Sequence, residues 1–300
     1  MEMQPWFETN DFSESAHYLG LTPQLRGWVD HYREKGYVIL EDTGIDDATV
    51  TAAISGLAGK YTQSATGYSS PGRLQDAWQT IPAVSQIATS QTILDALRTL
   101  YYREPVPFQT LNFERGTQQR AHSDTIHFNS LPLGFMCGVW VALEDADLDN
   151  GPLFYYPGSQ RLPVFHMHDL GLEASALEYQ KYEDRIEKIL SESGFKSERA
   201  LLKRGQALIW SANIFHGGSR VLDPNRTRLS QVTHYYFPGC IYYTPLLSDP
   251  MAQRWTLRQV KDIRTGQVQP DYQGLPRAER PKKKRRGLLA RIPSLFSVGR

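Results

Sequence analysis

The stretch RTRLSQVTHYYF, residues 226 to 237, alternates along its length in the way that is typical of a β-strand. Because successive strand residues point to opposite faces, one face would carry Arg226, Arg228, Ser230, Val232 and His234. The other face would carry Leu229, Gln231, Thr233 and Tyr235. An arginine inside a β structure is costly unless it meets an anion. The stretch therefore predicts a strand and also indicates a binding function.

Other β-rich runs surround this strand in the sequence from residue 106 onward. Gly, Pro, Asn and Asp separate PFQTLNFERG, GFMCGVWVALEDAD, GPLFYYPGS and GQALIWSANIFHGGS. Several antiparallel strands with turn signals between them favour a β-sandwich or barrel. One charged segment, residues 169–203, has a helical pattern and is expected to be an insertion between two of the strands.

The amino-terminal part has a different pattern, with helical spacing of its apolar residues. Helices are predicted over 22–35, where Thr22 and Pro23 suit a helix start, over 46–61, starting at Asp46 or Asp47, and over 91–102. Residues 36–44 (GYVILEDTG) predict a short strand. Residues 64–82 are rich in Ser, Gly, Pro and Gln and predict a loop, whose Tyr68 and Trp78 either face a substrate or pack.

The stretch AHSDTIHFNS, residues 121 to 130, places a histidine and a carboxylate two residues apart. On a strand, His122 and Asp124 would point to the same face. Two histidines and one carboxylate form the facial triad that holds non-haem Fe(II) with open positions. The candidate for the second histidine is His216, where IWSANIFHGGS runs into glycines that allow close backbone approach. Taken singly, each pattern is more often a structural histidine than a metal ligand.

A guanidinium followed two residues later by a hydroxyl suits the capture of a carboxylate, and Arg228 with Ser230 offers this pair. A dicarboxylate co-substrate would then chelate iron at one end and meet Arg228 at the other. The alternative is that the arginines lie at a strand mouth and pair with Asp223 or Asp145. Arg226 is the better candidate for that role and the second choice as anchor.

The segments AHSD, GVWVALEDAD, DNGPLFYYPGSQR, ALIWSANIFHGGS and RTRLSQVTHYY occur in this order, and together they resemble the phytanoyl-CoA dioxygenase family of Fe(II)/2-oxoglutarate oxygenases. The likeness runs from GYVILEDTG to THYYFPG. It implies a mainly β fold, a double-stranded β-helix (a jelly-roll or cupin-like barrel) with flanking helices. It implies Fe(II), 2-oxoglutarate and O2 as reactants, and hydroxylation of a small-molecule or lipid-like substrate with release of succinate and CO2.

The resemblance also implies roles for individual residues. His122, Asp124 and His216 would hold the iron, Arg228 with Ser230 would anchor 2-oxoglutarate, and Trp140 would line its pocket. His127 is read as a hydrogen-bond donor beside the ligands, a substrate contact or a core histidine. The chain has Gln160 where the family often has histidine, so altered loop bonding is expected there. His166 and His168 follow that loop and either reach the site mouth or lie in solvent.

Two other functions remain open. A cupin-like metal-binding protein would need no arginine–serine pair, and a non-catalytic binding barrel would be expected to lack part of the triad. This chain keeps His122, Asp124, His216, Arg228 and Ser230.

The charge is divided unevenly along the chain. Residues 277–300 hold nine of the 33 basic residues and one of the 32 acidic ones, which leaves 24 basic and 31 acidic residues before them. We therefore expect one oxygenase domain over 1–276 and a basic tail. Because apolar residues follow PKKKRR, the tail is a candidate for anionic membrane surfaces, with a solvated tail as the alternative. Nucleic acid is not expected as a partner, because no basic aromatic face accompanies the tail.

The expected location is the cytoplasm, with contact to a membrane surface through the tail as an addition. The start of the chain does not have the pattern of a signal peptide, and no run of apolar residues is long enough for a membrane span. Cys137 and Cys240, the two cysteines, form neither a disulfide framework nor a zinc motif. The sequence does not indicate an oligomeric state.

Overall fold

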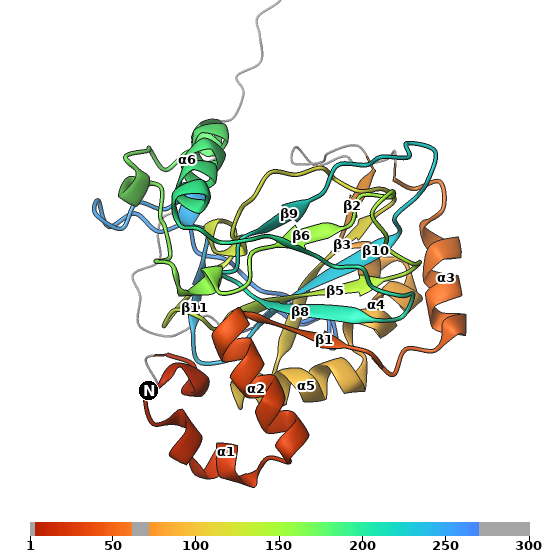
Figure 1. The fold of residues 1–300 in the computed structure, drawn as a ribbon, viewed down its shortest axis with the longest axis horizontal. Coiled ribbons are helices and arrows are strands. Elements are labelled where there is room, and N and C mark those ends of the chain that lie inside the picture. The colour runs from red at the N-terminus through yellow and green to blue at the C-terminus, as the bar shows by residue number, and fades with distance from the viewer. Residues whose placement is uncertain (1–3, 62–71, 270–300) are drawn as a thin grey trace, which may run out of the picture.

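The computed structural model describes residues 4–61 and 72–269 (Figure 1). The predicted basic tail and Tyr68 lie outside these residues. Within them, the α-helices are α1 (Ala16–Gly20), α2 (Pro23–Lys35), α3 (Asp47–Leu57), α4 (Pro82–Ala88), α5 (Gln91–Tyr101) and α6 (Tyr179–Glu192). Short 3-10 helices are η1 (Trp6–Glu8), η2 (Phe12–Glu14), η3 (Ala77–Gln79), η4 (Asp124–Ile126), η5 (Ser159–Arg161), η6 (His168–Leu170), η7 (Ala176–Glu178) and η8 (Pro245–Leu247). No helix in the described residues is long and apolar enough to cross a membrane.

The helices predicted from the first hundred residues are confirmed, and so are their start signals. The Thr22 hydroxyl accepts a hydrogen bond from the Leu25 amide at the start of α2. The Asp46 carboxylate accepts one from the Thr49 amide, 2.7 Å away, at the start of α3. Both side chains satisfy amides that the first turn of a helix leaves without a partner.

The strands form a main sheet, a small sheet and a pair, all antiparallel. The main sheet has six strands in the order β1 (Tyr37–Leu40), β8 (Ala207–Ser211), β5 (Met136–Ala142), β10 (Ser230–Tyr236), β3 (Val106–Phe113) and β2 (Arg73–Gln75). The small sheet has the order β7 (Glu198–Arg199), β6 (Leu153–Tyr155) and β9 (His216–Gly218). The pair is β11 (Ile241–Tyr243) with β4 (Asn129–Leu131). The predicted β-rich architecture with flanking helices is therefore confirmed.

Strand β10 lies inside the main sheet, and its two faces differ as the alternation predicts. On the outer face, the Gln231 amide donates to the Val84 carbonyl and the Tyr235 hydroxyl donates to the Ala88 carbonyl, both on α4. On the inner face, Val232 packs with Trp140 and Trp210 in the apolar layer between the two sheets. Figure 1 shows helices α2 and α5 on one side of the main sheet, with β6, β9 and α6 on the other. The side chains on the inner face can therefore contribute to a site between the two sheets.

Two expectations about loops and inserts were wrong in part. Residues 72–82 are not a plain loop: they contain β2, which pairs with β3, and η3. Trp78 packs against the helical core, and its indole donates to Asp76, so it is a packing residue. In the segment 169–203, α-helix covers Tyr179–Glu192 alone, and Glu198–Arg199 join the small sheet through β6. Gly194, with φ of 73°, follows the helix at a point where an L residue would be strained.

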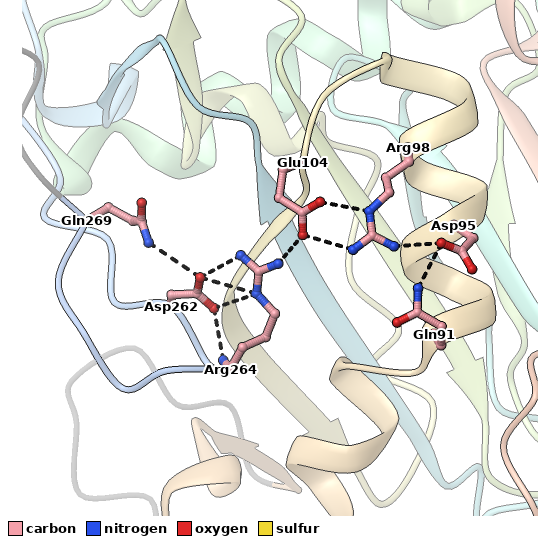
Figure 2. Close-up of polar contacts among 7 residues, drawn as sticks. All are labelled: Gln91, Asp95, Arg98, Glu104, Asp262, Arg264 and Gln269. Carbon is pink, nitrogen blue, oxygen red and sulfur yellow. Dashed lines mark hydrogen bonds and ion pairs between the residues drawn. The ribbon is translucent and has the colours of Figure 1, made fainter.

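A network of charged side chains ties the carboxyl-terminal segment to helix α5 (Figure 2). Arg98 donates two hydrogen bonds to Glu104, of 2.7 and 2.9 Å. Arg264 donates to Oε1 of Glu104, which also accepts from Arg98, and to Asp262, which is buried. Nearby, the Ile263 amide donates to the Pro107 carbonyl of β3. We call Arg98, Glu104, Asp262 and Arg264 the clasp.

We expect Glu104→Gln to loosen residues 259–269, because Arg98 and Arg264 would then share no carboxylate. The free energy of global unfolding should change by no more than about 1 kcal/mol, because the clasp is partly exposed. Amide hydrogen exchange over 259–269 should become faster in Glu104→Gln. The control Glu173→Gln, at an exposed carboxylate remote from the clasp, should leave the exchange unchanged.

Hydrogen bonding from Arg98 lowers the pKa of Glu104. The contribution is therefore present at neutral pH and lost as pH falls through that lowered pKa. Equal exchange in both variants would contradict this function of the clasp.

Candidate metal centre and cavity

One buried group among the described residues has the composition and spacing of a metal site. His122, Asp124 and His216 each offer one ligand atom, and these atoms lie within 4.8 Å of one another. Their backbones meet in an antiparallel bridge: the His122 amide donates to the His216 carbonyl at 3.0 Å, and the reverse bond is 2.9 Å. Two segments 94 residues apart are thus brought together by main-chain hydrogen bonds.

The backbone around Asp124 differs from the expected strand. After His122 the chain turns, because the Ser123 hydroxyl accepts from the Thr125 amide and caps η4, which starts at Asp124. Such local hydroxyl–amide bonds compete with strand pairing. Asp124 still points toward His216, since Nε2 of His216 lies 3.8 Å from Asp124 Oδ1. The glycines after His216 form strand β9 and not a turn. A Cβ at Gly218 would lie 2.6 Å from the Gln118 amide nitrogen, so glycine allows the close approach there.

Backbone carbonyls orient both imidazoles of this group. Nδ1 of His122 lies 3.0 Å from the Arg120 carbonyl, and Nδ1 of His216 lies 3.1 Å from the Ile214 carbonyl. A carbonyl accepts only, so each Nδ1 must carry the hydrogen. Each Nε2 is left with a lone pair, which is the form that binds a metal, and that of His122 lies 3.4 Å from the Gln119 side-chain nitrogen.

Asp124 is held by two residues that the sequence analysis did not include in the site. The Trp210 indole on β8 donates to Asp124 Oδ2 at 2.8 Å, and Nε2 of His234 on β10 lies 3.5 Å from the same oxygen. The other oxygen, Oδ1, faces His216. Trp210 has room for its indole because its strand neighbour is Gly138, where a Cβ would lie 2.4 Å from the indole ring. The alternation in β10 was a signal for His234.

The electrostatics favour the metal-binding protonation state. Burial, with a further contribution from His216, lowers the pKa of His122 to about 3, so this imidazole is neutral at neutral pH. Burial alone would raise the pKa of Asp124, but His216 and His234 outweigh it and lower that pKa. A neutral imidazole and an ionised carboxylate are the forms that bind a cation.

A cavity of about 560 Å³ opens from this group, and Arg228 lines it. The Arg228 guanidinium donates to the Ser230 hydroxyl at 3.0 Å and lies 5.4 Å from the centre of the Trp140 ring. Its Nε is buried without a hydrogen-bond partner, and no carboxylate of the described residues lies within ion-pair distance. Burial lowers the pKa of Arg228 to about 10, so it remains a cation at neutral pH. The cavity therefore contains a buried positive charge that forms no ion pair with a carboxylate of the described residues, and the more distant Glu144 offsets only part of the effect of burial on its pKa.

The other predicted residues lie as follows. Arg226 is outside the cavity lining and forms a two-bond ion pair with Asp147, of 2.9 and 2.7 Å, and not with Asp223 or Asp145. His127 would face away from His122 and Asp124 if a strand continued through it, but the turn at η4 ends that pattern: His127 lies in the lining, where its Nε2 is 3.2 Å from the Tyr179 hydroxyl. Gln160 donates to the Arg33 and Glu34 carbonyls near the end of α2.

His166 and His168 are not part of the cavity lining. Nε2 of His166 lies 2.8 Å from the Tyr243 hydroxyl, and Nε2 of His168 lies 3.0 Å from Asp169. His166 therefore has a partner on β11, and His168 has one in its own loop.

Comparison with solved structures places this fold among known enzymes. The epimerase SnoN from nogalamycin biosynthesis, described as non-haem and alpha-ketoglutarate dependent, matches 78% of this chain and 98% of its own, with a TM-score of 0.56 and 18% identity. EctD from S. alaskensis, solved with 2-oxoglutarate and 5-hydroxyectoine, matches 79% of this chain and 83% of its own, with a TM-score of 0.53 and 20% identity. At these identities the likeness bears on the fold alone, and it confirms the expected double-stranded β-helix.

Sequence comparison gives a narrower result. Phytanoyl-CoA dioxygenase domain-containing protein 1 of Mus musculus is 33% identical over 82 residues, which cover 26% of this chain and 28% of that protein. The protein of the same name from Danio rerio gives the same identity and coverage. These alignments span less than a third of the length of either relative. The model of the phytanoyl-CoA dioxygenase family, in contrast, matches residues 32–228, about two thirds of the chain. The chain therefore belongs to the phytanoyl-CoA dioxygenase family.

Proposed function

We propose that the protein is an Fe(II)- and 2-oxoglutarate-dependent dioxygenase that hydroxylates a C–H bond of a small-molecule substrate. The observation that carries this proposal is one cavity that contains both a His–Asp–His group and a buried arginine without an anion. The first feature suits a metal with open positions, and the second suits the far carboxylate of a dicarboxylate. Two of the structurally similar proteins are described with alpha-ketoglutarate or 2-oxoglutarate, which agrees with this proposal.

The residues present fit iron. In the proposal His122, Asp124 and His216 are its ligands, because their donor atoms converge and each Nε2 has a lone pair. Trp210 and His234 keep Asp124 Oδ2 occupied, which leaves Oδ1 for the metal. Bound iron would supply the oxidising chemistry: 2-oxoglutarate, O2 and a substrate C–H group give succinate, CO2 and an alcohol.

The residues also fit the co-substrate. Arg228 would pair with the distal carboxylate of 2-oxoglutarate, and Ser230 fixes the guanidinium. Trp140, over which Arg228 lies, would form one wall. Arg226 is satisfied by Asp147 at the surface, so the proposal gives the anchor to Arg228 alone. His127, in the lining beside Tyr179, is proposed as a contact to the substrate.

Arg228 also argues against the two other functions. A cupin-like metal protein without a co-substrate would not need a buried cation that forms no ion pair. A non-catalytic binding barrel would not be expected to keep this arginine together with the complete His–Asp–His group. Keeping such a cation costs stability, which a bound carboxylate would offset.

The first prediction of this proposal concerns binding of the co-substrate. Under anaerobic conditions, Fe(II) followed by 2-oxoglutarate should give the weak visible charge-transfer band of the iron chelate. Arg228→Met should weaken 2-oxoglutarate binding about 10- to 100-fold through loss of charge-assisted hydrogen bonds, while Arg226→Ala should not. Asp124→Ala should remove the band and succinate formation. Fe(II) binding without the band would favour the cupin-like function instead.

The second prediction concerns stability. Because Arg228 is buried with no carboxylate, Arg228→Met should leave the melting temperature of the ligand-free protein unchanged or higher, even though co-substrate binding is lost. Saturating 2-oxoglutarate should raise the melting temperature of the Fe(II)-loaded wild type and not that of the variant. A ligand-free variant that melts several degrees lower would show that Arg228 has a structural function.

A further inference from the structure

A second arginine, Arg258, lines the same cavity. The lining contains three arginines, Arg73, Arg228 and Arg258, and one carboxylate, Asp124. In the proposed function, on which this inference rests, Asp124 is used by the metal and Arg228 by 2-oxoglutarate. The charges of Fe(II) and 2-oxoglutarate cancel, so neither of them offsets the charge of Arg258.

Contacts between neighbouring side chains place Arg258 near the metal centre. Its guanidinium lies 4.5 Å from the centre of the Phe128 ring, and the Phe128 and His234 rings are 4.7 Å apart. His234 in turn approaches Asp124. Ser230, which binds Arg228, and His234 are four residues apart on β10, a separation of about 13 Å along the strand, and Arg228 lies before the strand starts. The two arginines therefore lie toward different ends of the cavity.

Arg258 has no carboxylate partner in the part of the chain that the structure describes. One guanidinium nitrogen donates to the Thr244 hydroxyl at 3.1 Å, and its Nε is buried with no hydrogen-bond partner. Two other arginines of this segment do have carboxylates: Arg254 pairs with Asp249, and Arg264 pairs with Asp262. The missing anion is thus particular to the arginine that faces the cavity.

The backbone that carries Arg258 is held in place on both sides. The Arg258 amide donates to the Tyr242 carbonyl at 2.8 Å, and Leu257 forms an antiparallel bridge with Tyr243 on β11. The clasp fixes the chain a few residues later (Figure 2). A fixed backbone lowers the entropic cost of presenting the guanidinium to a ligand.

The surroundings of Arg258 are apolar or uncharged. Phe128, Leu246 and Leu247 line this part of the cavity, and so does His127. Burial, to which Arg258 adds, lowers the pKa of His127 to about 4, so His127 is neutral at neutral pH. A ligand group bound here would meet the Arg258 guanidinium next to apolar side chains.

We propose that Arg258 binds an anionic oxygen group of the primary substrate, a carboxylate or a phosphate, attached to an apolar body that lies over Phe128 and Leu246. The planar guanidinium can form two parallel hydrogen bonds to such a group. The rest of the substrate then extends toward the metal centre, past His234.

The test uses the anaerobic complex of the protein with Fe(II) and saturating 2-oxoglutarate, so that Arg228 is occupied. Octanoate, heptyl phosphate and octanamide serve as probes with the same seven-carbon alkyl chain, and binding is followed by tryptophan fluorescence and calorimetry. At least one of the two anions should bind about tenfold or more tightly than octanamide. Which anion binds better identifies the group.

Variants separate Arg258 from a general effect of charge. Arg258→Ala should remove the preference for the anion, and Arg258→Gln, which keeps a donor for Thr244, should do the same. Arg254→Ala removes an equal charge from an exposed position on the same segment and should leave the preference intact. Suppose the chelate band forms, but the anions bind no better than octanamide or bind Arg258→Gln as tightly as the wild type. This inference is then overturned, while the proposed function stands. If the band does not form, the proposed function fails and this inference with it.

Discussion

The two main-chain hydrogen bonds between His122 and His216 are the constraint on which the rest of the site depends. They join the segment between β3 and β4 to strand β9 at the edge of the small sheet. They also set the distance between the two imidazoles. Once this bridge exists, the carbonyls of Arg120 and Ile214 lie where they orient the rings. The donor geometry is thus a property of backbone pairing, which is stiffer than any side-chain contact.

Around this bridge the fold keeps two kinds of polar group buried. Asp124 is fully engaged through one oxygen by Trp210 and His234, which agrees with the rule that buried carboxylates are hydrogen-bonded. Arg228 departs from that rule, since part of its guanidinium has no partner. Buried groups that are left unsatisfied in this way are typical of binding sites, where the ligand completes the network.

Much of this arrangement could be predicted from the sequence, and the reason is periodicity. The alternation over residues 226–237 assigned Arg228 and His234 to one face, and the structure has them there. The spacing of His122 and Asp124 identified the group, but not the turn between them, because a serine hydroxyl that caps a 3-10 helix leaves no periodic signal. The same turn explains why His127 faces the cavity. Trp210 could not be predicted as the partner of Asp124, since that contact depends on the register that sets it beside Gly138.

The position of the clasp has a consequence for how such a protein can diversify. The family match ends at Arg228, whereas Arg258 belongs to a later segment that is attached through β11 and, at the periphery, through Glu104 and Asp262. The two ends of the cavity are therefore encoded in separate stretches of the chain. Substitutions, or an exchange of residues 241–269 with those of a relative, would reshape one end while the strand register around the metal centre stays intact. Under the proposed roles, the residues that would hold the metal and the residue that would bind the substrate anion can therefore change independently of each other.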